Sequence, residues 1–220
     1  MVKKIILYGA SQYGGEVADH IHDINISKPT PEWEIVGFLD DNETMMGKER
    51  NGIPVLGNKT WLDANEVSHY YFLCCIGNPV VKRNIIAMLD SKNVKYATII
   101  HPSVIRSTSA QISEGCIIMA GTILSTFSVI EPHAIVNMAC TVAHNAIIGK
   151  YSNINPGSRI SGNVIMGEGS FVGSNAVIFE NLKVGKYSKI SSLAMVYSNI
   201  PETSIVMGVP GRVIDKNRAV

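Results

Sequence analysis

IVNMACTVAHNAIIGKYSNINPGS, residues 135–158, carries an aliphatic residue at every sixth position: Val136, Val142, Ile148 and Ile154. A period of six matches neither the 3.6 residues of a helical turn nor the two-residue alternation of a strand. It is the period of a parallel β-helix of hexapeptide repeats, in which each hexad forms one short side of a prism. This stretch therefore predicts the fold of the second half of the chain.

The same register extends in both directions, and three sides make one coil. We expect residues 18 apart to stack about 4.8 Å from one another, the spacing of adjacent strands, and we expect roughly five coils. A mostly small residue follows four positions later, as at Cys116, Thr122 and Ser128, and fits the tight corner between two sides. The aliphatic positions, which we expect to point into the axis, are Ile112, Ile118, Leu124, Ile130, Val136, Val142, Ile148, Ile154, Ile160, Met166, Val172, Ile178, Val184, Ile190 and Val196.

Residues 1–98 follow a different pattern, in which short apolar runs alternate with helical periodicity. KKIILYG (3–9), EIVGFLD (34–40) and YYFLCCIG (70–77) predict buried strands, and residues 11–24 and 79–93 predict helices. This order predicts a small Rossmann-like domain with a parallel sheet. We expect residues 28–33 and the polar segment 40–54 at the surface. The predicted domains are 1–98, α/β, and 99–220, an all-β parallel β-helix with a C-terminal tail.

Composition excludes several classes of protein. The formal net charge is +1 and 46% of residues are hydrophobic, so neither disorder nor a nucleic acid partner is expected. No run of about 18 apolar residues predicts a membrane span, and the short apolar run near the N-terminus predicts a buried strand rather than a signal peptide. The four cysteines form no CxxC pair and the histidines share no ligand spacing. We therefore expect a cytoplasmic protein with reduced, buried thiols and no metal site.

The stacking rule places a glycine beside a histidine. The column through His144 reads Thr126, His144, Gly162, Glu180 and Ser198. Because glycine has no side chain, a ligand could reach the imidazole and the Gly162 backbone together. An ordinary surface histidine at a tolerant position also accounts for this spacing, so the column alone leaves both interpretations open.

Seven segments in order carry a family resemblance. With these the chain resembles the bacterial hexapeptide-repeat sugar acyltransferases, a group of nucleotide-linked amino-sugar N-acetyltransferases and sialic acid O-acetyltransferases. The resemblance implies a small nucleotide-sugar-binding α/β domain joined to a left-handed β-helix. The segments are YGASQYGGEVAD (8–19), GFLDD (37–41), CIGN (75–78), HPS (101–103), VNMACTVAHNAIIGKYSNINPGSRISGNV (136–164), GSFVGSNAVI (169–178) and MGVPGRVI (207–214).

The resemblance implies that His144 is the general base. A neutral imidazole can take the proton that an amine or hydroxyl loses when it attacks a thioester. Many relatives carry Glu or Asp after this histidine, whereas this chain has Asn145, which can hold a tautomer but cannot stabilise an imidazolium by charge. Asn137 matches a family asparagine near the acceptor.

The resemblance also implies acetyl-coenzyme A (acetyl-CoA) as the co-substrate, bound in a groove between neighbouring β-helices. Gly162 and Gly173 would contact it through their backbones, and the Gly162 amide is a candidate donor to the oxyanion. In GVPGR, Pro210 would pack on the cofactor and Arg212 would pair with its phosphates. A plain proline-glycine turn is the alternative for this segment.

The N-terminal domain would bind the nucleotide-sugar. GASQYGG follows a strand and opens a helix, a geometry that favours an anion, but the dinucleotide pattern GxGxxG fails at Ser11. For the paired aspartates at the end of the second strand, an ordinary turn is the alternative. The residues that the resemblance places around the ligand are Gly9, Ser11, Tyr13, Gly14, Asp40, Asp41, Gly77 and Asn78.

Together these observations predict an acetyltransferase that acylates the 4-amino group of a UDP- or dTDP-linked 4-amino-4,6-dideoxy sugar for surface glycan synthesis. The resemblance further implies a homotrimer whose active sites are shared between chains. Two alternatives stay open: an O-acetyltransferase acting on sialic acid or another sugar, and a non-catalytic scaffold that senses a nucleotide-sugar. The sequence leaves open the base, the sugar and its stereochemistry, and acyl donors larger than acetyl.

Overall fold

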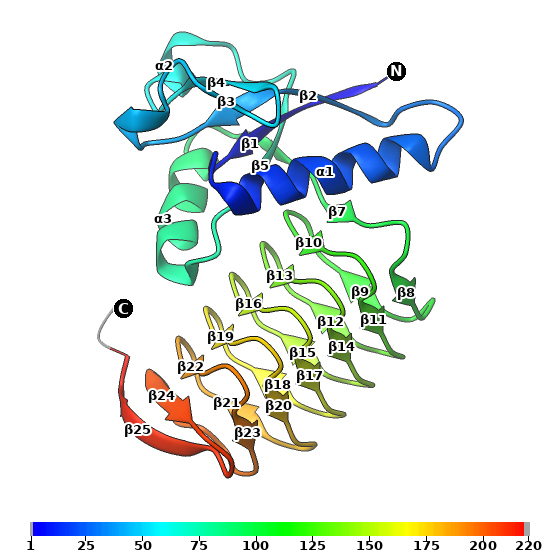
Figure 1. Cartoon of the computed structure of the whole chain (residues 1–220), viewed down its shortest axis with the longest axis vertical. Helices are drawn as coiled ribbons and strands as arrows, with labels where there is room; N and C mark the ends of the chain where they lie inside the picture. The colour runs from blue at the N-terminus through cyan, green and yellow to red at the C-terminus, as the bar shows by residue number, and fades with distance from the viewer. Residues whose placement is uncertain (1, 218–220) are drawn as a thin grey trace. The chain divides into compact units, whose positions relative to one another are not determined.

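The computed structural model describes residues 2–217, and its contacts divide the chain into two compact units. The first unit comprises Met1–Gly77 and Val81–Pro102, and the second comprises Asn78–Val80 and Ser103–Val220. Figure 1 shows an α/β unit and a stack of flat coils. None of the helices in residues 2–217 has the length and apolar character that a membrane crossing requires.

The first unit is built on a mainly parallel sheet with strand order β3-β4-β2-β1-β5-β6. β1 lies at the centre and pairs in parallel with β2 and β5, as the buried apolar runs predict. The strands and helices are β1 (Lys3–Tyr8), α1 (Gln12–Ile26), β2 (Trp33–Leu39), a 3-10 helix η1 (Glu43–Met45), β3 (Glu49–Arg50), β4 (Ile53–Gly57), α2 (Trp61–Ala64), β5 (Tyr71–Cys74), α3 (Pro79–Asp90), β6 (Lys95–Tyr96) and β7 (Ile99–Ile100).

Residues 28–32 and 40–54 are exposed or partly exposed, as expected, but the sequence did not predict the strands within 40–54 or the burial of Trp33. Within residues 40–54, β3 and β4 form a hairpin whose turn residues, Asn51 and Gly52, have φ of 53° and 73°. Left-handed φ at both turn residues is what an Asn-Gly hairpin turn requires, and β4 then extends the sheet by pairing in parallel with β2. The connector 28–33 ends at Trp33, which begins β2 and is buried, with its ring packed edge-on against Tyr71.

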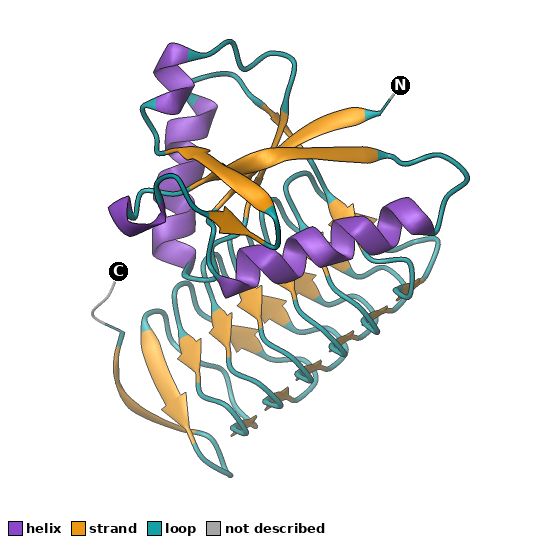
Figure 2. Cartoon of the chain, turned by 45° about the horizontal axis from the view of Figure 1, so that its top comes forward, coloured by secondary structure: helices purple, strands orange, loops and turns teal. Residues whose placement is uncertain are grey.

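The second unit is a three-sided parallel β-helix in which residues 18 apart pair, as predicted. The last coil is two residues shorter, since Lys189 pairs with Ile205. Figure 2 shows the short strands stacked coil upon coil. Side 1 comprises β10 (Ile117–Ile118), β13 (Ile135–Val136), β16 (Asn153–Ile154), β19 (Phe171–Val172), β22 (Lys189–Ile190) and β24 (Ser204–Met207), and β25 (Arg212–Lys216) pairs antiparallel with β24. Side 2 comprises β8 (Ile105–Arg106), β11 (Ile123–Leu124), β14 (Thr141–Val142), β17 (Arg159–Ile160), β20 (Val177–Ile178) and β23 (Met195–Val196). Side 3 comprises β9 (Gln111–Ile112), β12 (Val129–Ile130), β15 (Ile147–Ile148), β18 (Ile165–Met166) and β21 (Lys183–Val184).

The axis of the prism is filled by the aliphatic register. From Ile118 to Val196 each of its members is buried, and burying one such side chain stabilises the fold by about 1.5–3 kcal/mol. Ile112, in an end strand of side 3, stays partly exposed. The small corner residues are buried too, and hydroxyls among them satisfy turn carbonyls: Thr122 Oγ1 donates to the Asn137 carbonyl over 2.8 Å.

Candidate active site

His144 follows β14 and lies exposed on the edge between sides 2 and 3. The Asn163 N–H of the next coil donates to the His144 carbonyl over 2.9 Å, which brings Gly162 beside the histidine. A Cβ on Gly162 would lie 2.5 Å from His144 Cε1 and 2.6 Å from Nε2. The stacking expected from the spacing is confirmed: only glycine leaves room for the imidazole in this position.

The Gly162 N–H has no backbone acceptor among the described residues. In the backbone hydrogen bonds among residues 2–217, the Gly162 carbonyl accepts from the Asn181 N–H over 2.9 Å, whereas no carbonyl accepts from the Gly162 N–H. An N–H fixed in a rigid coil beside an imidazole is suited to stabilising an oxyanion.

Asn145 contacts the histidine side chain. Its Nδ2 lies 3.2 Å from His144 Nδ1 and 3.2 Å from Asn163 Oδ1. Asn163 Nδ2 in turn donates to Asn181 Oδ1 over 3.0 Å. Asn145 was expected from the sequence, whereas Asn163 and Asn181 were not, although the 18-residue spacing relates both to Asn145.

Asn137 and Gly173 lie on a different edge from His144, because they follow β13 and β19 of side 1. Asn137 is buried, and its Oδ1 accepts from the Met138 N–H over 2.7 Å. A Cβ on Gly173 would lie 2.4 Å from the Ser192 nitrogen, so the next coil already requires glycine there. The edge that holds His144 within one chain therefore holds neither Asn137 nor Gly173.

The GVPGR turn is fastened to the last strand of side 2. The Met195 N–H donates to the Gly208 carbonyl over 3.1 Å, and the Gly211 N–H donates to the Met195 carbonyl over 2.7 Å. Pro210 and Arg212 are exposed. Met195 lies in β23, three strands from β14, so the turn is displaced from His144 along the axis by about 14 Å at the usual strand spacing.

In the first unit, the loop after β1 is closely packed around its glycines. Gly9 has φ of 114°, in the region that favours glycine, and a Cβ on Gly14 would lie 2.0 Å from the Gly9 carbonyl oxygen. Ser11 is the N-cap of α1 and its Oγ accepts from the Gly14 N–H over 3.4 Å. The start of α1 is thus brought against the loop, with the helix N-terminus available to an anion.

Asp40 and Asp41 lie beside this loop at the carboxyl end of β2. Asp40 Oδ2 accepts from the Ala10 N–H over 2.7 Å, and Asp41 Oδ2 accepts from the Tyr8 hydroxyl over 2.9 Å. Burial raises the pKa of Tyr8 above its usual value, and the hydrogen bond to Asp41 adds to the increase. Asp41 also borders a pocket of about 330 Å³, lined by Asp41, Lys59, Val81, Asn84, Ile85 and Met88.

Tyr13 and Arg50 complete this region. The Tyr13 hydroxyl is buried and has no hydrogen-bond partner among the described residues, and burial raises the pKa of Tyr13 well above its usual value. Arg50 donates through Nε to the Ala10 carbonyl over 3.0 Å and through Nη1 to Gln12 Oε1 over 3.3 Å. Arg50 was not predicted as a site residue, because the polar segment 40–54 was assigned to the surface without any strand; the Asn-Gly pair after Arg50 is the signal of a hairpin.

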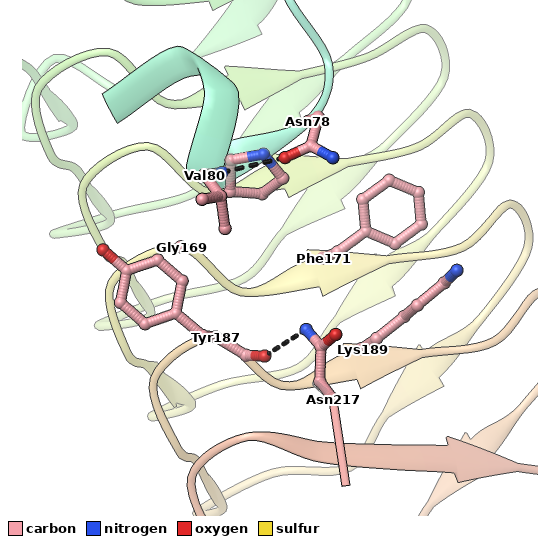
Figure 3. A pocket seen from close by; sticks show the side chains of 8 residues that line it. Asn78, Val80, Gly169, Phe171, Tyr187, Lys189 and Asn217 are labelled. Carbon is pink, nitrogen blue, oxygen red and sulfur yellow. Dashed lines mark hydrogen bonds between the residues drawn. The ribbon is translucent and has the colours of Figure 1, made fainter. Parts of the chain in front are cut away.

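Gly77 lies partly exposed after β5, and Asn78 borders a pocket of about 220 Å³ within the second unit (Figure 3). Asn78 Oδ1 accepts from the Val80 N–H over 3.0 Å. The pocket is lined by residues of β19 and β22 on side 1, so it does not lie on the edge that holds His144. Its lining residues are Asn78, Pro79, Val80, Gly169, Phe171, Tyr187, Lys189 and Asn217. Across residues 2–217, no three His, Cys, Asp or Glu side chains are grouped to hold a metal ion.

Two family models match the sequence. Residues 4–89 match the PglD N-terminal domain, and residues 145–180 match the bacterial transferase hexapeptide, a model of six repeats. No curated protein matches the sequence.

Solved structures match both units together. The acetyltransferase domain of PglB from Neisseria gonorrhoeae FA1090, in complex with acetyl coenzyme A, is 28% identical with a TM-score of 0.87, over 97% of this chain and 100% of that one. WeeI from Acinetobacter baumannii AYE is 26% identical with a TM-score of 0.85, over 97% and 100%. PerB from Caulobacter crescentus, 21% identical with a TM-score of 0.85 over 98% and 99%, shares the fold.

The fold and both modules therefore define a hexapeptide-repeat transferase with an α/β domain ahead of a left-handed β-helix, as predicted. More narrowly, the chain is similar over nearly its whole length to the acetyltransferase domain of PglB, in agreement with the resemblance that its sequence carries.

Proposed function

We propose that the protein transfers an acetyl group from acetyl-CoA to the 4-amino group of a nucleotide-linked 4-amino-4,6-dideoxy sugar, with His144 as general base. The observation that carries the proposal is the imidazole of His144 lying against Gly162, on a chain that matches the acetyl-CoA complex of the PglB domain over 97% of its length. We further propose that the product serves surface glycan synthesis.

The residues of the His144 edge suit acyl transfer. The acceptor nitrogen attacks the thioester carbonyl carbon, and His144 takes the proton that this nitrogen loses. The Gly162 N–H donates to the oxygen that becomes negative in the tetrahedral intermediate. When the carbon–sulfur bond breaks, His144 returns the proton to the leaving thiolate, so that amide and free thiol are the products.

The co-substrate fits the same side of the prism. His144 lies on the edge that follows β14 of side 2, and the exposed GVPGR turn is hydrogen-bonded to β23 of the same side. An extended acyl carrier can span the strands between them. Pro210 would pack on the carrier and Arg212, which is exposed, would pair with its phosphates.

The first unit fits a nucleotide-sugar. Ligands of open α/β sheets bind at the carboxyl ends of the strands, where this unit brings together the glycine loop after β1, the N-terminus of α1 and Asp40 and Asp41. The Arg50 guanidinium at this loop provides a cation for a diphosphate. The pocket beside Asp41 offers apolar contacts to a base.

We propose a homotrimer, because the residues assigned to one site lie on two edges of the prism. Asn137 and Gly173 lie on the edge after side 1, and His144 and Gly162 lie on the edge after side 2. Two edges of one convex prism face different directions, so these pairs can meet only if neighbouring prisms lie side by side. Because acetyl-CoA and nucleotide-sugars are cytoplasmic metabolites, we place the protein in the cytoplasm.

The test is thiol release from acetyl-CoA with a panel of UDP- and dTDP-linked 4-amino-4,6-dideoxy sugars and with sialic acid. We expect turnover of one nucleotide-linked amino sugar, and a loss of about 10²–10⁴-fold in His144→Ala. His69→Ala is the matched control, because the His69 side chain is 72% exposed and its one ion pair within residues 2–217 is with Glu66, at 3.6 Å.

Two rivals predict other outcomes of this assay. An O-acetyltransferase would turn over sialic acid and leave the nucleotide-linked sugars untouched. A non-catalytic sensor would bind a nucleotide-sugar and release no thiol with any acceptor. Full turnover by His144→Ala would reject the proposed mechanism.

A further inference from the structure

We propose that Asn145, Asn163 and Asn181 form an amide ladder whose polarity selects the tautomer of His144. Asn163 and Asn181 do not contact the imidazole, so they are positioning residues that act through Asn145. The step from tautomer to turnover rests on the proposed function; the link between ladder and tautomer does not.

The coil geometry places the three amides in a row. Asn145, Asn163 and Asn181 occupy the same corner of successive coils, with φ of 57°, 58° and 62°. Their N–H groups donate to the carbonyls of Thr126, His144 and Gly162 over 3.0, 2.9 and 2.9 Å. Asparagine tolerates this left-handed conformation better than most residues, and the repeated backbone bonds hold the side chains one strand spacing apart.

Hydrogen bonds join the row to the histidine. One amide atom of Asn145, its Nδ2, lies 3.2 Å from both His144 Nδ1 and Asn163 Oδ1. The other end of the Asn163 amide lies 3.0 Å from Asn181 Oδ1. If a single amide turned over, oxygen would face oxygen or nitrogen would face nitrogen, so the three amides must turn together.

The two polarities have opposite consequences for the imidazole. With the Asn145 nitrogen toward His144, the polarity in which the structure has the three amides, Nδ1 must accept, so the neutral ring carries its proton on Nε2 and cannot take another there. Turning all three amides over keeps every N···O pair at the same distance and places the Asn145 oxygen against Nδ1–H. Nε2 is then free to accept a proton, and the imidazolium that results still donates to Asn145.

Only the second polarity serves a general base. In it the Asn145 oxygen faces the imidazolium, which favours positive charge there, and Asn163 holds that oxygen in place by donating to it. The ladder would thus take over the orienting role of the carboxylate that relatives carry after the histidine.

A carboxylate at the far end of the ladder, introduced by Asn181→Asp, should force the first polarity. The new carboxylate could only accept, so Asn163 would turn its nitrogen to it and its oxygen to Asn145, whose nitrogen would then face His144. Asn181→Ala frees the end and favours neither polarity. We therefore expect kcat to be lowest in Asn181→Asp, about three- to tenfold below Asn181→Ala, the effect of one hydrogen bond.

A lower kcat in Asn181→Asp than in Asn181→Ala is the opposite of what two simpler explanations, charge and backbone conformation, predict. If position 181 acted through charge, an added carboxylate would stabilise the imidazolium and raise kcat. If it acted only through its backbone conformation, with φ of 62°, Asp would be tolerated better than Ala. No ion pair to His144 occurs among the described residues, and the acidic member of its column is Glu180.

The direct experiment is ¹⁵N NMR of the His144 ring in the free protein at pH about 8, where an unperturbed imidazole is neutral. We expect the Nδ1–H tautomer in the wild type and the Nε2–H tautomer in Asn181→Asp. Asn93→Asp is the matched control: Asn93 is exposed, has φ of 51° and lies in the first unit, away from the prism edges that the proposed site uses. It should change neither tautomer nor kcat. If Asn181→Asp fails to fold, Asn163→Asp should give the same change of tautomer, because its carboxylate accepts directly from the Asn145 nitrogen.

The ladder would be overturned if the same tautomer were found in the wild type, Asn181→Ala, Asn163→Asp and Asn181→Asp. It would also be overturned if Asn181→Asp kept the wild-type tautomer and had a kcat at or above that of Asn181→Ala. A tautomer shift with unchanged kcat would support the ladder and reject His144 as the base, so the two proposals fail separately.

Discussion

The imidazole of His144 lies flush against the backbone of Gly162, so close that a Cβ on Gly162 would stand 2.5 Å from Cε1 and 2.6 Å from Nε2. Real Cβ atoms do not come this near to ring atoms. The histidine therefore keeps its position only because the next coil presents no side chain.

Gly162→Ala should displace the imidazole without unfolding the prism, because Gly162 is not among the glycines with positive φ. We expect kcat to fall at least about tenfold, since a general base must stay within hydrogen-bond reach of its proton. Steady-state kinetics with the reactive amino sugar measure this, and the melting temperature reports whether the fold survives. Wild-type kcat in a folded Gly162→Ala would show that the position of this ring does not matter.

Periodicity explains which parts of the structure were predictable. In the β-helix each hexad has the same environment, so one register from Ile118 to Val196 predicts strands, corners and stacking at once. The hairpin of β3 and β4 lies in a polar segment with little periodicity, so neither the hairpin nor the role of Arg50 was predicted. Asn51 and Gly52, which form the turn, were the available signal.

The spacing of the site residues could also have predicted that they lie on two different edges of the prism. Asn137 and His144 are seven residues apart, more than one hexad, so they had to fall on successive corners. The sequence could not predict how the side chains are oriented. The hydrogen bond between Asn145 and His144 Nδ1 depends on side-chain rotamers, which the spacing does not specify.

Asp41→Ala tests the nucleotide end of the site. The change removes a carboxylate that borders the pocket near β2, and also the partner of the Tyr8 hydroxyl. We expect KM for the nucleotide-sugar to rise about tenfold, the effect of one charge-assisted hydrogen bond, while KM for acetyl-CoA stays unchanged. Both constants should be measured at saturating partner substrate. An unchanged acceptor KM would place the nucleotide elsewhere and favour a free-sugar acceptor.

The buried thiols predict a pH dependence of stability. Burial raises the pKa of Cys74 to about 11 and that of Cys140 to about 11, against 9.0 for an exposed thiol. The unfolded chain ionises these thiols first, so the free energy of unfolding should fall as pH rises above about 9, by up to about 1.4 kcal/mol per pH unit for each thiol. Urea titrations at pH 8, 9 and 10 measure this fall, and Cys74→Ala/Cys140→Ala should reduce it.

The same burial predicts that the cysteine thiols react slowly in the folded protein. At pH 8 a thiol of pKa about 11 is ionised in about one molecule in a thousand, and all four cysteines are buried. A disulfide reagent should therefore label the native protein slowly and the urea-unfolded protein at once. Rapid labelling of the native protein would contradict the burial of these residues.

Mixed assemblies test whether two chains complete one site. Asn137→Ala and His144→Ala chains should each be nearly inactive alone. In a ring of three, every mixed trimer has one interface that joins an intact His144 to an intact Asn137, so mixed trimers should recover about a third of wild-type activity. They should be obtained by co-expression with two different affinity tags and sequential purification. As the control, His144→Ala co-expressed with Asn137→Ala/His144→Ala contains no intact histidine and should stay inactive. No recovery in the first mixture, with trimers present, would show that Asn137 and His144 do not meet across an interface.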